Sequence, residues 1–429
     1  MKRRVVVTGL GAITPLGNDL EKTWQGMLEG RSGVGPITAF PAENFKPGYA
    51  AEVKDFKPEQ YVEKRKALKM MGRNIQLALA AAQMSVADSG VLESVDRTRM
   101  GVLLGTGMLN ADIAELGKAV RASRDENGEF DMSRFGEAGS SNLFPLWLLR
   151  HIPNLVSSHI AILYGAQGPS NIITTTCTSG AQAIGEAARI IERGQAQVML
   201  AGASDARIDI LSMVKYRKLG IMTTDDRDPS TASRPFDSEA NGFVCGEGAA
   251  VLVLEELDHA KARGAKVYAE LVGIGLSTDA YDFIRQHPEG RGMQLSMKRA
   301  MKDAELNVDD IDYISPNGAS IPDFDIAETR AVKAVFGERA KKVPMSAVRS
   351  MIGHTHAACG AIEAVVCVKA INESVVPPTV NLDRPAAECD LDYVPKTARQ
   401  MPVNVALSNN FGFGGHSASL LFRGMEARV

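Results

Sequence analysis

Two kinds of hydrophobic pattern alternate along the 429 residues of the chain. Short apolar runs rich in β-branched residues are typical of strands. They occupy residues 4–11, 101–107, 197–205, 249–257, 266–275, 312–318 and 404–422, the last holding two strands joined by the tight FGFGG connection. Longer stretches at helical spacing predict helices at residues 67–89, 179–193, 293–305 and 357–373. Strands and helices in alternation predict an α/β fold.

The helix predicted from residue 179 has small residues on almost all of its faces. Such a helix packs against neighbours on every side, unlike an amphipathic surface helix. Further along, a charged stretch at residues 256–266 separates two apolar runs. We therefore expect two α/β halves of roughly equal size, at residues 1–258 and 259–429.

Composition narrows the class of protein. The chain is 45% hydrophobic and 23% charged, and a net charge of −3 with both signs interspersed indicates neither a nucleic-acid surface nor a membrane surface. No apolar run reaches 18 residues, and Gly9, Gly11 and Pro15 interrupt the N-terminal run, so we expect no transmembrane span and no signal peptide. Five cysteines without framework spacing favour a reducing compartment, and hence a cytoplasmic protein.

The segment TTTCTSGAQAIG places Cys177 where a strand ends and a helix begins. The unpaired amides and the dipole of a helix N-terminus favour the thiolate over the thiol. Cys177 is therefore a candidate nucleophile, and the alternative is a buried structural cysteine. A nucleophilic cysteine also needs a partner from elsewhere in the chain, usually a histidine.

Three of the seven histidines are good candidates for that partner. His354 and His356 precede a small-residue helix, and His416 follows the FGFGG turn, whereas the other histidines include two in polar, solvated stretches. A metal site at His354, His356 and Cys359 is an alternative that lacks further ligands. The GLGAITPLG stretch fails the spacing of a dinucleotide-binding loop, so we do not expect it to bind a dinucleotide.

A glutamate inside an apolar helix also needs explanation. Glu363 lies within AACGAIEAVV, where it requires a buried partner, and Arg349, just upstream, is a reasonable one.

Taken in order, these segments resemble the β-ketoacyl-acyl-carrier-protein synthases of the type II fatty-acid group, which are condensing enzymes of the thiolase superfamily. The resemblance spans nearly the whole chain. It runs from RRVVVTGLGAITPLGND through TTCTSGAQAIG, RPFDSEANGFVCGEGAAVLVLEEL and SMIGHTHAACGAIEA to SNNFGFGGHSASLLF. It implies a duplicated αβαβα five-layer sandwich that is normally a homodimer.

The resemblance also implies roles by position. Cys177 would accept an acyl group from acyl carrier protein, His354 would be an active-site histidine, and the Phe413 amide would join that of Cys177 in an oxyanion hole. Arg349 and Glu363 take the place of a supporting lysine–glutamate pair. Three positions would bind or gate the substrate, namely Met108, Phe411 and His416. A structural cation is an option near Glu363, Ser408 and Asn409.

The chain departs from the family at its remaining catalytic histidine. The segment ISPNGASIPDFD replaces a stretch that reads roughly HGTxTP, so Asn317 stands where the family has histidine. Two histidines of the family stabilise the enolate oxygen while the malonyl extender loses CO2. An asparagine amide can donate a hydrogen bond to that oxygen, but it cannot shuttle a proton near neutral pH. Arg349 in place of lysine and His416 in place of threonine alter the surroundings further.

The sequence therefore predicts an acyltransferase in which acyl carrier protein loads Cys177 and decarboxylative condensation with a malonyl extender follows. The altered site favours a specialised fatty-acid or polyketide-type pathway. Two alternatives remain open: transfer or hydrolysis through the Cys177 thioester without elongation, and a non-catalytic partner subunit, against which the retained cysteine counts. We hypothesise that His416 partly replaces the missing imidazole. Expected partners are acyl carrier protein and a second copy in a homodimer, or a related synthase in a heterodimer. The resemblance implies no tightly bound organic cofactor, because the pantetheine arm arrives with the carrier protein.

Overall fold

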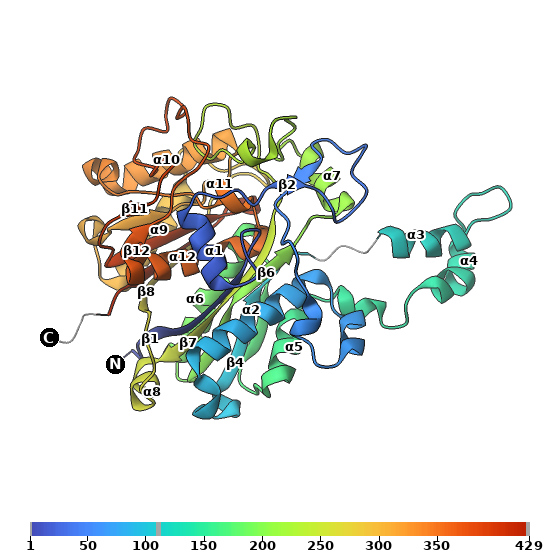
Figure 1. The fold of residues 1–429 in the computed structure, drawn as a ribbon, viewed down its shortest axis with the longest axis horizontal. Coiled ribbons are helices and arrows are strands. Elements are labelled where there is room, and N and C mark those ends of the chain that lie inside the picture. Colours follow the sequence, from blue (N-terminus) through green and yellow to red (C-terminus); the bar gives the residue numbers. More distant parts are fainter. Residues whose placement is uncertain (1, 109–112, 426–429) are drawn as a thin grey trace.

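A computed structural model describes residues 2–108 and 113–425 (Figure 1). Nine strands of the described residues form one mixed sheet in the order β5-β4-β6-β7-β1-β8-β13-β12-β9. The strands are β1 (Val5–Ile13), β4 (Met100–Gly105), β5 (Ser170–Ile173), β6 (Val198–Ala206), β7 (Glu247–Glu256), β8 (Ala269–Thr278), β9 (Tyr313–Ser315), β12 (Val405–Phe411) and β13 (His416–Arg423).

The sheet contains the same unit twice. Strands β1, β7, β6 and β4 follow one another with antiparallel, antiparallel and parallel neighbours. Strands β8, β13, β12 and β9 repeat that arrangement, and the two units meet where β1 pairs with β8. The duplication is a property of the topology, and no repeat is visible by eye in the sequence.

Helices cover both outer faces and fill the middle of the molecule. The larger helices are α2 (Arg73–Ser89), α5 (Leu155–Tyr164), α6 (Ser179–Glu192), α7 (Ile210–Lys218), α9 (Arg291–Ala304), α10 (Pro322–Phe336) and α12 (Cys359–Glu373). Helix α2 packs on β1 and β7, α9 packs on β8 and β13, and α6 and α12 pack against each other between the two strand units (Figure 1). This order of layers confirms the predicted α/β, thiolase-like sandwich.

The two central helices approach closely because small residues line their contact. A Cβ atom on Gly180 would lie 2.8 Å from the Ala361 nitrogen, and one on Gly360 would lie 2.6 Å from the Ala181 nitrogen. Most residues of α6 and α12 are buried, and the partly exposed residues of α6 include Gln182, Glu186 and Arg189. The contact brings the N-terminal ends of these helices together, and with them Cys177 and His354.

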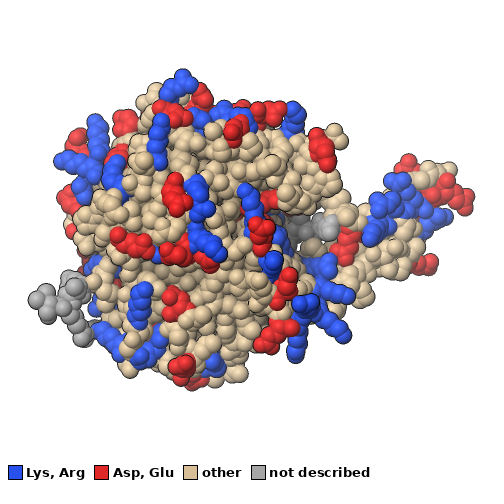
Figure 2. All heavy atoms as spheres, viewed as in Figure 1, with Lys and Arg blue, Asp and Glu red and all other residues tan. Residues whose placement is uncertain are grey.

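The part of the chain that carries α3 (Ile113–Ala122) and α4 (Met132–Arg134) extends away from the body as an arm (Figure 1). This arm and the adjacent α5 expose large apolar side chains at Ile113, Phe130, Met132, Leu146, Leu148, Ile162 and Leu163. Figure 2 shows Lys, Arg, Asp and Glu interspersed over the visible face of the molecule. Within residues 2–108 and 113–425, no helix is long and apolar enough to cross a membrane.

Candidate active site

Cys177 lies in the sharp turn that joins β5 to α6. A single 3-10 turn, η8 (Thr176–Thr178), precedes the helix, and Thr176 takes a left-handed φ of 56°. Residues other than glycine adopt this conformation at a cost, which is commonly met at functional sites. The turn holds Cys177 only 5% exposed, directly before the first turn of α6.

His354 is the partner of Cys177. Its Nε2 lies 3.4 Å from the cysteine Sγ. The His354 amide donates to the Val244 carbonyl at 2.7 Å, and the His356 amide donates to Nδ1 of His354 at 3.2 Å. Because Nδ1 is an acceptor, the neutral ring carries its hydrogen on Nε2, facing the sulfur. Burial, helped by Arg349 and His356, holds the pKa of His354 well below its usual range, so the ring is neutral.

The helix N-terminus is not the strongest influence on the Cys177 thiol. Burial raises the pKa of Cys177 to about 11, although the positive charge of Arg349 acts in the opposite direction. Desolvation of a nearly buried sulfur outweighs the helix terminus on which the prediction rested. The resting pair is therefore a thiol beside a neutral imidazole that can donate a hydrogen bond to sulfur.

Asn317 follows β9, and its side chain is held at one end. Its Oδ1 accepts a hydrogen bond from the Phe411 amide at 3.0 Å. The bond from Phe411 is the one hydrogen bond that this side chain makes among the described residues, so both hydrogens on Nδ2 remain available. The next residue after Phe411, Gly412, packs on the nucleophile, since a Cβ there would lie 3.2 Å from the Cys177 nitrogen. The segment of residues 411–412 therefore contacts Asn317 with one residue and Cys177 with the next.

Two carboxylates that sequence reasoning missed fix the Asn317 loop. Glu328 on α10 accepts the amides of Asn317 and Gly318 at 2.8 and 2.9 Å, and Asp325 accepts the amide of Ala319 at 2.8 Å. Burial raises the pKa of Glu328 to about 8 and that of Asp325 to about 7. The signal in the sequence was their spacing of three residues on one helix face, directly after the altered motif.

Arg349 and Glu363 form the predicted buried pair. Arginine Nε lies 2.7 Å from one carboxylate oxygen and Nη2 lies 3.2 Å from the other. Burial raises the pKa of Glu363 to about 7 against the lowering effect of Arg349. The guanidinium thus takes both carboxylate oxygens, and in the described part of the chain no three His, Cys, Asp or Glu side chains converge as metal ligands. The optional structural cation near Glu363, Ser408 and Asn409 stays a prediction.

The amides expected to form an oxyanion hole are available. Phe413 opens η13 (Phe413–Gly415), next to Gly412, which packs on Cys177. Neither the Phe413 amide nor the Cys177 amide donates to another residue within 2–108 and 113–425. Two unpaired N–H groups on adjoining segments are suited to binding a developing oxyanion.

The remaining predicted positions lie around this centre. Met108 is 67% exposed just beyond the end of β4. Phe411 is buried in the core of the second half and contributes its amide to Asn317. The ring of His416 lies against Gly414, and it makes no hydrogen bond to Cys177, His354 or Asn317 in the described structure. His356, an alternative metal ligand in the sequence, contacts Cys245 at 3.3 Å.

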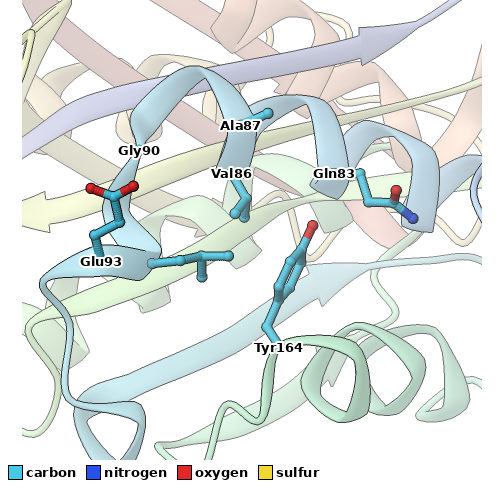
Figure 3. A pocket seen from close by; sticks show the side chains of 7 residues that line it. Gln83, Val86, Ala87, Gly90, Glu93 and Tyr164 are labelled. Carbon is cyan, nitrogen blue, oxygen red and sulfur yellow. The ribbon is translucent and has the colours of Figure 1, made fainter.

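A surface pocket lies elsewhere, between α2 and α5 (Figure 3). Tyr164 points into it, and Gln83, Val86 and Glu93 are among the other lining residues. It contains none of the predicted site residues, and its side chains form no catalytic arrangement.

Comparison with known proteins agrees with the geometry. The family model "Beta-ketoacyl synthase, N-terminal domain" matches residues 2–260, and "Beta-ketoacyl synthase, C-terminal domain" matches residues 268–383. A relative from Synechocystis sp. named 3-oxoacyl-acyl-carrier-protein synthase 2 is 42% identical over 423 residues, 98% of each chain.

Two solved structures are similar over 99% of this chain and 100% of theirs. One is a ketosynthase bound to a hexaketide in complex with its type II polyketide acyl-carrier protein (TM-score 0.86, 32% identity). The other is the ishigamide ketosynthase/chain length factor (TM-score 0.88, 31% identity). The fold, the paired Cys177 and His354 and these matches lead to one conclusion: the chain belongs to the β-ketoacyl synthase family of acyltransferases.

Proposed function

We propose that this protein is a condensing enzyme that extends an acyl chain held on Cys177 by decarboxylation of a malonyl group, both delivered by acyl carrier protein. In the first step the Cys177 sulfur attacks the acyl thioester, the bond from the acyl carbon to the pantetheine sulfur breaks, and the cysteine proton ends on the departing thiol. His354 Nε2–H donates to the cysteine sulfur as it gains negative charge.

In the second step the malonyl carboxylate leaves as CO2, and its electron pair forms an enolate on the extender. His354 Nε2–H and Asn317 Nδ2–H donate to the enolate oxygen. The enolate carbon then attacks the Cys177 thioester, whose oxygen is stabilised by the amides of Cys177 and Phe413. When the new carbon–carbon bond is formed, the cysteine sulfur leaves and takes a proton from solvent.

One observation carries this proposal above the others. Asn317 is anchored through Oδ1 on the Phe411 amide, so that its Nδ2–H groups are left to act as fixed donors beside Cys177. Stabilisation of an enolate needs a donor in place and no titration of that donor. The altered positions Asn317 and Arg349 favour a specialised pathway. Similarity at 32% identity to a type II polyketide ketosynthase is consistent with that.

A second function, acyl transfer without elongation, is favoured by the absence of an imidazole at residue 317. A single experiment separates the two. Purified protein is incubated with an acyl-carrier-protein primer and malonyl-acyl-carrier-protein, with Cys177→Ala as the control, and products are identified by mass spectrometry. A Cys177-dependent product two carbons longer supports condensation. Acylated Cys177 without a longer product contradicts condensation and supports transfer alone. No selective acylation at Cys177 would support a non-catalytic partner subunit.

We also propose how the chain is assembled. The two halves divide at residues 258 and 259, within the short α8 (Leu257–Ala262) that joins the two strand units. Cys177 then belongs to the first half, and Asn317, His354 and Phe413 to the second, so that the site lies at their junction. The expected cytoplasmic location stays a prediction.

A second copy of the chain is the proposed dimer partner. Strand β5 is the outer strand of the sheet, and the arm and α5 nearby expose apolar side chains that include Ile162 at 80% exposure. Free strand edges and apolar patches are typical of subunit interfaces. Sedimentation velocity of the wild type and Ile162→Glu tests this: a dimer that weakens in the variant supports the proposal, and a monomeric wild type contradicts it.

A further inference from the structure

A second buried cysteine–histidine pair lies beside the first. The Sγ of Cys245 is 3.3 Å from Nε2 of His356, and the Cys245 thiol donates to the Arg207 carbonyl at 3.6 Å. A carbonyl can only accept, so the single thiol hydrogen goes to Arg207 and the hydrogen on Nε2 of His356 donates to sulfur. This assignment leaves Nδ1 of His356 as an acceptor.

The second pair is not a second nucleophile. Cys245 is only 1% exposed, and burial together with Asp209, Asp205 and Glu247 raises the pKa of its thiol. Burial also holds the pKa of His356 well below its usual range. Both groups are neutral, and Cys245 therefore serves to orient the His356 ring.

Tyr216 on α7 stacks on His356, which lies beside His354 of the catalytic pair. Its ring stacks on that of His356 with centroids 4.9 Å apart and planes at 14°. The His356 ring in turn lies 4.9 Å from that of His354. The described part of the chain makes no hydrogen bond to Tyr216 Oη or to His356 Nδ1; Tyr216 is half-buried and His356 is 6% exposed. Cys177 lies near enough to the tyrosine to affect its pKa, which burial raises.

Arg207, which directly follows β6, is the third polar residue beside Tyr216 and His356. Its Nε lies 2.9 Å from Oδ1 of Asp205, and both side chains are almost fully buried. A Cβ atom on Gly107 would lie 2.3 Å from Nη2 of Arg207, so the guanidinium fills the space left by that glycine. The next residue is Met108, where the family resemblance places a wall of the acyl site.

Tyr216, His356 and Arg207 together form what we call the polar wall. A saturated alkyl chain against this wall would remove water from the tyrosine hydroxyl and from His356 Nδ1 without replacing their hydrogen bonds. Such desolvation is unfavourable for each group left unpaired. A hydroxyl or keto oxygen on the acyl chain would instead accept from Tyr216 or Arg207, and a hydroxyl could also donate to His356.

We propose that the polar wall selects an acyl group that carries a hydroxyl or keto oxygen close to its thioester, in preference to a saturated fatty acyl group. This inference rests on the proposed function, because it concerns the acyl group that is loaded on Cys177. Sites that hydrogen-bond a substrate oxygen discriminate strongly against the analogue that lacks it.

The test compares two thioesters of equal chain length, hexanoyl-pantetheine and 3-hydroxyhexanoyl-pantetheine, the latter as each enantiomer. Intact-protein mass spectrometry follows the rate of Cys177 acylation by each. The wild type is expected to react at least about tenfold faster with one hydroxylated enantiomer than with the hexanoyl compound. Tyr216→Phe should reduce this ratio about tenfold and His356→Leu should reduce it as well, while both variants still accept hexanoyl-pantetheine.

Tyr164→Phe is the matched control, because Tyr164 lines the separate surface pocket of Figure 3. It should leave the ratio unchanged. Equal acylation by all the thioesters in the wild type, or a ratio that Tyr216→Phe does not alter, would overturn the polar-wall inference and leave the proposed function intact. No acylation of Cys177 by any of the thioesters would overturn both.

Discussion

Replacing Asn317 by leucine tests whether its amide acts as a fixed donor in decarboxylation. Leucine has a similar volume at this position, where Asn317 is only 2% exposed, but it removes both the Oδ1 acceptor and the Nδ2–H donors. Loss of one donor to a developing oxyanion lowers turnover about 100- to 1,000-fold. Loss of the 3.0 Å bond from the Phe411 amide leaves a buried N–H unpaired and costs about 1–3 kcal/mol of stability.

The two losses are measured separately. Condensation is followed as CO2 release or as the product two carbons longer, acylation as the mass shift of Cys177, and stability by urea unfolding. Cys177 acylation should stay within about threefold of the wild type, because Asn317 acts only in the second step. Asn372→Leu is the control, since Asn372 lies in the last turn of α12 and donates to the backbone carbonyls of Tyr268 and Val368. Unchanged condensation in Asn317→Leu, or equal loss of acylation and condensation, would refute the assigned role.

Three further predictions concern the surroundings of the site. Arg349→Met leaves Glu363 buried without its partner and should lower the free energy of unfolding by about 3–5 kcal/mol in urea titrations; a loss below about 1 kcal/mol would contradict the ion pair. Burial raises the pKa of Glu328 to about 8 and that of Asp325 to about 7, so the folded state binds more protons than the unfolded chain. Stability from these groups is fully present below the ordinary pKa values of 3.8 and 4.5 and is lost as pH rises from there through about 7 and 8, and Glu328→Gln should flatten this slope in unfolding experiments at several pH values. If His416 partly replaces the missing imidazole, His416→Ala should slow condensation about tenfold with acylation unchanged; full activity would dispose of the idea.

The sequence by itself determined the order and type of the main elements. The spacing of hydrophobic residues and the positions of glycines are local properties of the sequence, and they predict individual elements. The strands lie where this pattern predicts them at residues 5–13, 100–105, 198–206 and 247–256. The strand expected to end before Cys177 is β5, whereas helix α10 was not predicted. At residues 67–70 the expected helix is instead a 3-10 segment, η2 (Arg65–Met70).

Motif order also predicted which residues meet. Cys177 and His354 lie 177 residues apart in the chain and 3.4 Å apart in space, and Arg349 pairs with Glu363 as expected. These contacts follow from a scaffold whose central helices carry small residues at their crossing. The sequence alone could therefore place the nucleophile, its histidine and the altered Asn317 in one site.

Only the tertiary structure decided the chemical state of these groups. The thiol form of Cys177, the tautomer of His354, the anchoring of Asn317 and the polar wall around Tyr216 each depend on burial and on partners distant in the sequence. The physical reason is that desolvation and hydrogen bonding are set by everything packed around a group, whereas hydrophobic period and turn chemistry are set by its neighbours along the chain. A helix N-terminus can be read from the sequence, but the burial that outweighs it at Cys177 cannot.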